Sequence, residues 1–405
     1  MNLPLIVALA LLLAPAILLP GPRIQPIPEA EWTDVHRSLV AIYWQGGPVP
    51  NYFRTFLNHP ELVKGVMPFE QYILHGTALT PRQLELVILR TAWLCRSEYL
   101  WARHATAAKA AGISRHELRR IAGGPDAGWD VFEAALLRAA DELHAEANVS
   151  DETWHTLTGW LDRRKLMDVV FTATEFTMLA DTFNSVGVQV DSSDTERLPK
   201  LDYRVPPAKH IAPLQTARIP PIESSALTPQ LRAMLDPGGS GRPVAAVYRT
   251  YAQDPELYPS RQLLSEYIRA HATLSPRVRE LLILRIGVLC RTEYEWGAHA
   301  PAGRRAGLSD ADIRGIYAGA DGTEDPFDRA LLRAVDELYR DDVIADATWK
   351  TLAARFDARR MLDVLITAAG YRMASMAMNA FGVQLEPGSE RFPAAPAAPG
   401  TSTSR

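Results

Sequence analysis

Residues 84–95 have the sequence LELVILRTAWLC, and residues 280–290 have the sequence ELLILRIGVLC. Both stretches are apolar on nearly every side of a helix, which is the pattern of a helix buried in a protein core. Each follows a hydroxyl residue and a proline, at 80–81 and 275–276, which are typical of an N-cap and the first position of a helix. The two stretches therefore predict a buried helix that occurs twice in the chain.

The repetition extends over most of the sequence. A shift of 195 residues aligns the chain with itself without a gap, from Arg23 against Arg218 to Gln189 against Gln384. In the window 80–115, 19 of the 36 positions are identical to those of the other copy. A gapless match of this length indicates two copies of one domain.

The two copies define the expected organisation of the chain. It comprises an apolar segment over 1–22, a first repeat over 23–190, a linker over 191–217, a second repeat over 218–385 and a disordered tail over 386–405. The linker is polar and then bears prolines, and the tail is of low complexity. We expect the two copies to pack through a pseudo-two-fold interface that takes the place of a homodimer.

Each copy is expected to be all-α, with about six or seven helices. Strand-like alternation is scarce, and helix stop signals such as Gly112 and Gly307 occur at suitable intervals. A second apolar helix is predicted over residues 165–185 and again over 360–380. The sequence therefore predicts two tandem helical domains.

The composition is that of a globular protein. The chain has 405 residues, of which 47% are apolar and 22% are charged, and its net charge is −4. These values exclude a disordered or fibrous chain, and the lack of a basic excess argues against a nucleic-acid partner. The two cysteines, Cys95 and Cys290, cannot form a disulfide framework, and no Cys/His motif predicts a metal site.

The first twenty residues form an apolar segment without a charged side chain. They resemble the apolar region of a signal peptide, although prolines interrupt them. They also lack the Lys or Arg that a signal peptide normally has in its first residues. If the segment is a signal or an anchor, the protein is exported or membrane-anchored, and residues 1–20 are its only membrane contact. Otherwise we expect a cytoplasmic location.

Two carboxyl groups lie within the predicted buried helices, Glu85 and Glu280. A buried carboxyl must find a partner or have a raised pKa, and a raised pKa suits proton transfer near neutral pH. The alternative is a structural ion pair with Arg90, Arg285 or another arginine.

Each copy has a histidine seven residues after a hydroxyl residue that begins the next predicted helix. The pairs are Ser97 with His104 and Thr292 with His299. Seven residues return a side chain to nearly the same helical face, so the hydroxyl and the imidazole share it. In the second copy Glu295 joins that face, where the first copy has Leu100. The alternatives are a capping box from Thr292 to Glu295 and histidines that only fill the core.

These residues resemble the carboxymuconolactone decarboxylase and alkylhydroperoxidase D superfamily. The resemblance rests on Glu85 and Glu280, on RSEYLWARH at 96–104 and on RTEYEWGAH at 291–299, and it covers nearly all of both repeats. It implies two alkylhydroperoxidase D-like helical domains that act on a small-molecule substrate.

The resemblance also implies proton transfer without a cofactor. In the lactone substrate of the family, loss of CO2 leaves a carbanion conjugated to the lactone carbonyl, and a Glu/His pair can deliver the proton. The implied catalytic residues are Glu280, His299, Glu295, Glu85 and His104, and the implied substrate-binding residues are Thr292 and Ser97. The predicted activity is that of a lyase or isomerase on a small carboxylated or lactone substrate. We expect the second copy, which has one acid more, to carry most of the chemistry.

Two other functions remain open from the sequence. The alkylhydroperoxidase branch has Cys-x-x-Cys at the helix start, but the corresponding positions here are Ser97 and Leu100, and Thr292 and Glu295. A peroxidase would need Cys95 or Cys290 instead, because a thiolate is the nucleophile. The third function is non-catalytic binding or scaffolding with degenerate sites. Since single-copy relatives form rings of dimers, the resemblance also implies a homotrimer of this chain.

Overall fold

The computed structural model describes residues 21–44, 46–200 and 210–393, and within these ranges the chain forms helices and no strand. The first domain contains α1 (Asp34–Tyr43), α2 (Asn51–Phe56), α3 (Pro60–Gln71), α4 (Pro81–Leu94), α5 (Glu98–Ala110), α6 (Arg115–Gly123), α7 (Val131–Glu146), α8 (Asp151–Thr158) and α9 (Arg163–Val186). The second domain contains α10 (Pro229–Leu235), α11 (Ala246–Tyr251), α12 (Leu257–Glu266), α13 (Pro276–Leu289), α14 (Glu293–Arg305), α15 (Asp310–Ala318), α16 (Pro326–Asp341), α17 (Asp346–Ala353) and α18 (Ala358–Phe381). Short 3-10 or π turns are η1 (Glu29–Glu31), η2 (Tyr72–Gly76), η3 (Ser224–Ala226), η4 (Tyr267–His271) and η5 (Ala320–Gly322).

The all-α prediction is confirmed, but the number of helices is larger than expected. In the described part of the chain each domain has nine α-helices rather than six or seven. The additional helices are short, such as α2 with 6 residues and α8 with 8 residues. Helices of one or two turns contain too few residues for a period to be recognised in the sequence.

The two buried helices predicted from the sequence are α4 and α13. The side chain of Thr80 accepts a hydrogen bond from the backbone N–H of Gln83, and Ser275 accepts one from Val278. Residues 84–92 are all buried, as an apolar helix without a polar face requires. These two helices form the interior of their domains and carry the two glutamates.

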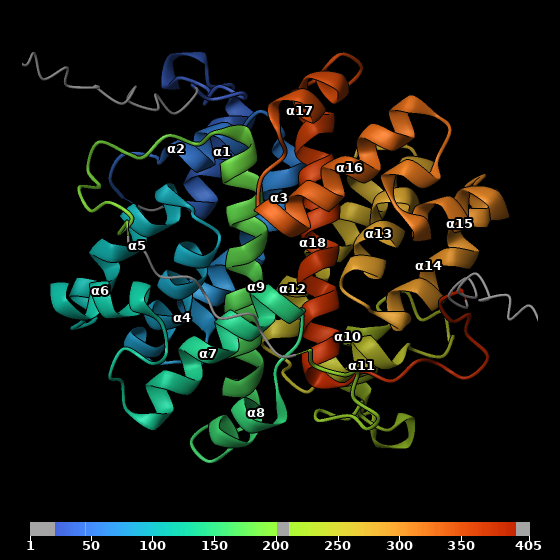
Figure 1. Ribbon diagram of the computed structural model, residues 1–405, viewed down its shortest axis with the longest axis horizontal. Coiled ribbons are helices and arrows are strands. Elements are labelled where there is room, and N and C mark those ends of the chain that lie inside the picture. The colour runs from blue at the N-terminus through green and yellow to red at the C-terminus, as the bar shows by residue number, and fades with distance from the viewer. Residues whose placement is uncertain (1–20, 45, 201–209, 394–405) are drawn as a thin grey trace, which may run out of the picture.

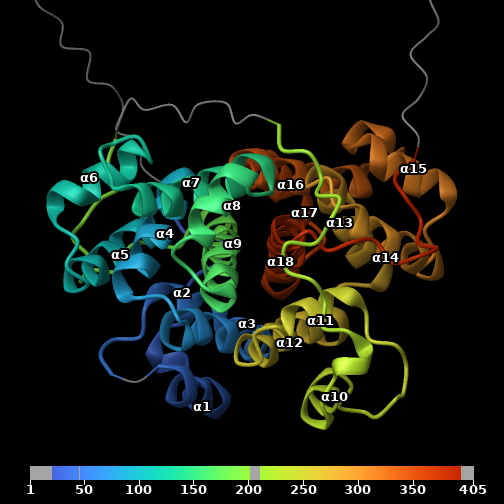
Figure 2. The same ribbon diagram turned by 90° about the horizontal axis from the view of Figure 1, so that it is seen from below.

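Helices α9 and α18 lie side by side at the centre of the molecule (Figure 1). Each has 24 residues, nearly all of them buried, and they contact one another more extensively than any other pair of helices. They contain the second apolar segments predicted from the sequence. Figure 2 views this pair nearly end-on, with the remaining helices of each domain on its own side. The pair therefore joins the two domains into one core.

Contacts between the domains occur in matching pairs. The guanidinium of Arg23 in the first domain lies over the ring of Trp349 in the second, 4.9 Å from its centroid. Arg218 of the second domain lies over Trp154 of the first at 5.0 Å. Both pairs are related by the same shift of 195 residues, and such reciprocal contacts are expected of two copies around a pseudo-two-fold axis. The homotrimer stays a prediction.

One buried cluster of charges departs from this symmetry. Arg372 on α18 is 1% exposed, and its Nη1 lies 3.0 Å from Asp181 and 2.9 Å from Asp342. The corresponding positions, shifted by 195 residues, hold uncharged side chains: Thr177, Met376 and Ala147. The first domain contributes one aspartate, and the second contributes the other and the arginine. The cluster therefore links the domains through a charged contact that has no counterpart.

The prediction of a disordered tail from residue 386 is wrong for its first part. Phe392 packs against Trp296 with ring centroids 5.4 Å apart, and Glu390 forms an ion pair with Arg304 at 2.6 Å. Through these two contacts the first part of the tail is attached to α14. Residues 394–405, like the apolar residues 1–20 and the linker residues 201–209, lie outside the described ranges. Of the helices that are described, none is long and apolar enough to cross a membrane.

We predict that Arg372→Thr lowers the free energy of unfolding by about 3–5 kcal/mol, because it leaves Asp181 and Asp342 buried without their cation. Urea denaturation followed by circular dichroism measures the change. Combining it with Asp181→Met and Asp342→Ala copies the uncharged arrangement of the other half and should recover most of the loss. Arg340→Gln, which removes an exposed ion pair with Asp341, is the control and should leave the midpoint unchanged. A midpoint for Arg372→Thr equal to that of the control would contradict the prediction.

Candidate active sites on the paired helices

The predicted glutamate and histidine of the first domain form a buried pair. Nδ1 of His104 on α5 lies 3.1 Å from Oε2 of Glu85 on α4, and the two residues are 7% and 6% exposed. Phe176 on α9 holds the imidazole edge-on, with ring centroids 4.9 Å apart. The alternative of an ion pair between Glu85 and Arg90 is wrong, because Arg90 binds Asp141 at 2.5 and 3.0 Å. In the second domain Glu280 does form an ion pair with another arginine, Arg279, at 3.2 Å.

The second domain repeats this pair with an additional acid. Nδ1 of His299 lies 2.7 Å from Oε2 of Glu280, and its Nε2 lies 3.3 Å from Oε2 of Glu295. Both nitrogens of this imidazole therefore face a carboxylate. Tyr371 on α18 packs edge-on against the ring at 5.1 Å, as Phe176 does in the first domain.

The three groups of the second domain shift one another's pKa values. Burial alone would lower the pKa of His299, but the hydrogen bond and charge of Glu280 together with the charge of Glu295 raise it above its ordinary value. Burial would raise the pKa of Glu280, but the hydrogen bond and charge of His299 lower it. Burial raises the pKa of Glu295. The second domain thus favours a charged His299–Glu280 ion pair.

Ser97 and Thr292 occupy the expected N-cap positions, but neither side chain caps its helix. Both are buried, at 0% and 2% exposure, beneath the turn between two helices. The hydroxyl of Ser97 has no hydrogen-bond partner among the described residues, and that of Thr292 lies 3.2 Å from Oδ1 of Asn379. The capping box from Thr292 to Glu295 is therefore wrong. Neither residue lines the large cavity beside His104 or the smaller pocket beside His299, in contrast to the expected contact with substrate.

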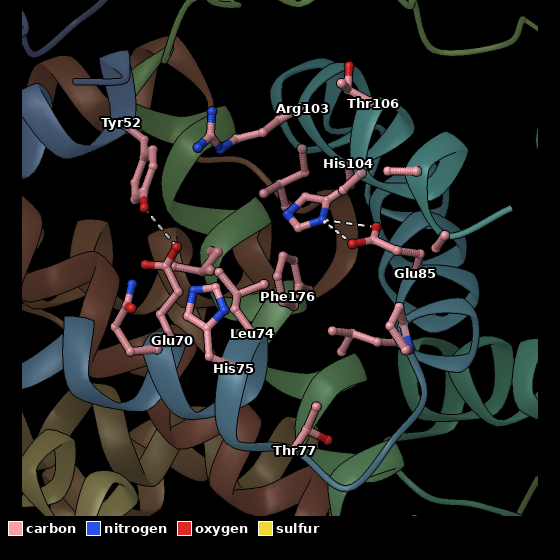
Figure 3. A pocket seen from close by; sticks show the side chains of 18 of the residues that line it. Tyr52, Glu70, Leu74, His75, Thr77, Glu85, Arg103, His104, Thr106 and Phe176 are labelled. Carbon is pink, nitrogen blue, oxygen red and sulfur yellow. Dashed lines mark hydrogen bonds and ion pairs between the residues drawn. The ribbon is translucent and has the colours of Figure 1, made fainter. Parts of the chain in front are cut away.

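A cavity of about 1130 Å³ adjoins the Glu85–His104 pair in the first domain. Its walls come from α1, α2, α3, α4, α5 and α9, and from the π turn η2. Figure 3 shows Arg103 and His104 projecting from α5 toward the same side, with Tyr52 and Glu70 across the pocket. The tyrosine hydroxyl donates a hydrogen bond of 2.8 Å to that carboxyl. Burial raises the pKa of Glu70, so a second weak acid faces the cavity.

Arg103 is a pocket residue that the sequence analysis does not identify. Its guanidinium lies 5.1 Å from the ring centroid of Trp44 and 5.8 Å from that of Tyr52. Within the described residues it makes no ion pair or hydrogen bond, and it lines the cavity. The signal in the sequence is its place directly before His104, where the second copy has Ala298.

The pocket of the second domain is much smaller, at about 170 Å³. Glu295, His299 and Met378 line it. Tyr248 and Tyr371 also line it, where the first domain has phenylalanines. The additional acid favours the second domain as the site of the chemistry, but the volume available to a substrate favours the first.

Comparison with known protein families identifies both halves. Residues 60–142 and 255–337 each match the model of the Carboxymuconolactone decarboxylase family. The two matched segments contain the Glu85–His104 and Glu280–His299 pairs. The resemblance seen in the sequence is therefore confirmed, in two copies. No curated protein and no solved structure matches the chain.

The ion pair of the second domain predicts a pH-dependent contribution to stability. His299 has a raised pKa, so its contribution is complete below the ordinary value of 6.5 and is lost as the pH rises through the raised value. Glu280 has a lowered pKa, so its contribution is present above 4.5 and is lost as the pH falls through the lowered value. His299→Gln should therefore cost most between pH 4.5 and 6.5 and less in alkaline solution.

Thermal unfolding of wild type and His299→Gln from pH 4 to pH 9 tests this expectation, because it gives the difference in stability at each pH. The exposed His155 provides the control, since His155→Gln should give a difference that does not vary with pH. A stability loss for His299→Gln that is the same at every pH would show that the imidazole acts by packing alone.

Proposed function

We propose that this chain, which carries two domains of the carboxymuconolactone decarboxylase family, is a cofactor-independent lyase or isomerase for a small carboxylated or lactone substrate, and that the first domain performs the reaction. The observation that carries the proposal is the cavity of about 1130 Å³, which brings the Glu85–His104 pair and the unpaired Arg103 onto one wall. The second domain retains Glu280, Glu295 and His299 in a pocket of about 170 Å³, so it is the lesser candidate.

Arg103 is suited to bind a substrate carboxylate. A guanidinium presents two parallel N–H donors that match the two oxygens of a carboxylate. No hydrogen bond or ion pair occupies them within the described residues, although, against the effect of burial, the charges of Glu70 and Asp194 in the same cavity help to raise the pKa of Arg103. The rings of Trp44 and Tyr52 fix the plane of this group and provide an apolar surface for the rest of the substrate. His104 lies beside Arg103 in the pocket (Figure 3), so it would face the atoms next to the bound carboxylate.

His104 is suited to transfer the proton. Its Nδ1 faces Glu85, which orients the ring and leaves Nε2 for the substrate. In a decarboxylation the carbon–carbon bond to the carboxylate breaks and CO2 leaves. The electron pair moves into the conjugated carbonyl to give an enolate. The N–H at Nε2 then donates a proton to the carbon that lost CO2, and the imidazole takes up a new proton from solvent. In an isomerisation the same nitrogen removes and returns a proton. Both reactions conserve electrons, so neither needs a redox partner.

The chemistry of the thiols argues against the peroxidase alternative. Cys95 and Cys290 are fully buried, and burial raises the pKa of both thiols, that of Cys290 to about 12. A neutral thiol is a poor nucleophile, and neither domain offers a second cysteine to resolve the oxidised form. The scaffolding alternative predicts that no substrate is turned over and that the polar residues of the large cavity have no effect on any assay.

We predict that His104→Ala lowers kcat by about 10²–10⁴, the usual effect of losing a general acid or base. A screen of muconolactone-type acids with CO2 release as the readout identifies the substrate, and a hydroperoxide assay runs beside it. His299→Ala is the matched control, because it removes the equivalent imidazole from the smaller pocket. Circular dichroism shows whether both variants are folded.

The comparison of the two histidine variants decides which domain is active. A larger loss for His299→Ala at equal stability would place the chemistry in the second domain. Peroxide turnover that is lost on thiol blocking, without CO2 release, would support the peroxidase function instead.

Arg103→Met should raise KM for the carboxylated substrate by at least about tenfold, because it removes a charge-assisted, bidentate contact. Arg103→Lys should recover only part of the loss, since an ammonium lacks the planar fork. Arg269→Met is the control, because Arg269 lies exposed at the rim of the second pocket. Equal KM values for Arg103→Met and wild type, measured by steady-state kinetics, would show that Arg103 does not bind the substrate.

A further inference from the structure

A cluster of three potential metal ligands lies where the two domains meet. Cys95 follows the last residue of α4, His144 lies on α7, and Asp342 follows the last residue of α16. One ligand atom from each lies within 4.8 Å of the others, and Nε2 of His144 is 3.0 Å from Oδ2 of Asp342. None of the three lines the cavity that holds His104, so the cluster is separate from the proposed active site.

The other half of the molecule has the same backbone without these ligands. Asp342 has a left-handed conformation with φ of 56°, and its counterpart Ala147 has φ of 52°. Tyr339 stands where the first domain has His144, and only the cysteine, Cys290, is retained. The two places therefore differ in two of the three side chains, but not in the turn that presents them.

Matching hydrogen bonds hold the two turns. Nδ2 of Asn184 donates to the carbonyl of Cys95 at 2.8 Å and to that of Asp342 at 3.2 Å. Asn379 makes the same two contacts in the other half, at 2.8 and 3.0 Å. The asparagine on α9 thus fixes the backbone of one ligand from each domain, which keeps these two ligands at a constant separation.

The surroundings of the cluster supply the features of a metal site. Oδ1 of Asp342 accepts a hydrogen bond of 2.9 Å from Arg372, which orients the carboxylate as outer-shell partners commonly do. Arg372 also contacts Asp181 at 3.0 Å, and burial raises the pKa of that carboxyl to about 8. A thiolate at Cys95 and the carboxylate of Asp342 would supply the negative charge that a divalent cation requires. His144 is 22% exposed and provides the route from solvent.

We propose that Cys95, His144 and Asp342 bind one divalent transition-metal ion, with Zn²⁺ as the best match, and that this ion fastens the first domain to the second. Cysteine sulfur, histidine nitrogen and aspartate oxygen each bind this borderline-soft ion, and with three protein ligands a water molecule would complete its tetrahedral coordination. On binding, the metal takes the place of the hydrogen bond between His144 and Asp342, and the thiol releases its proton to solvent. The three ligands are far apart in the sequence, so no local sequence motif predicts this site.

Titration of the chelator-treated full chain with Co²⁺ tests the proposal. We expect saturation at one ion per chain, with visible d–d bands and the near-ultraviolet charge-transfer band of a cobalt thiolate. Cys95→Ser and His144→Tyr should abolish the charge-transfer band and the saturable binding. Cys290→Ser is the matched control and should leave both unchanged, because Tyr339 and Ala147 provide no further ligands there.

Thermal unfolding gives a second readout that is independent of activity. Zn²⁺ should raise the Tm of wild type and of Cys290→Ser by several degrees, and should not raise that of Cys95→Ser. Absence of saturable Co²⁺ binding in wild type, or equal binding by Cys95→Ser and Cys290→Ser, would overturn the proposal. Neither outcome depends on the reaction assigned to the large cavity.

Discussion

The packing of α9 against α18 is the contact on which the rest of the structure depends. These two apolar helices come from opposite halves of the chain, and neither could be buried without the other. Each also provides the aromatic ring that holds the histidine of its own domain, Phe176 against His104 and Tyr371 against His299. The core between the domains and part of the wall of each pocket therefore come from the same pair of helices.

Because the two copies are joined in one chain, corresponding positions in the two domains can have different residues. In a homodimer both sites must have the same residues, whereas here each can change separately. The first domain combines Arg103 with a cavity of about 1130 Å³, and the second has Glu295 and a pocket of about 170 Å³. The same freedom explains the charged cluster of Arg372, Asp181 and Asp342, whose counterpart positions hold uncharged side chains. We infer that one half is specialised for chemistry and that the other mainly completes the core.

The sequence predicted the features that repeat and missed those that depend on packing. The Glu85–His104 pair was predictable because both residues lie on consecutive helices and recur in the second copy. The partner of Arg90 was not, because Asp141 lies 51 residues away on another helix. Arg103 and Glu70 were missed because helical periodicity does not say which side of a helix faces an open cavity. Ser97 has the right spacing for the site, yet the turn before α5 buries its side chain.

The central claim is that a carboxylated substrate binds in the first domain between Arg103 and His104. A crystal structure of the chain with an unreactive lactone carboxylate measures this directly. The account predicts a ligand in the large cavity, with its carboxylate on the guanidinium of Arg103 and the carbon next to it facing Nε2 of His104. A ligand found only in the pocket beside His299, or one whose carboxylate avoids Arg103, would contradict it.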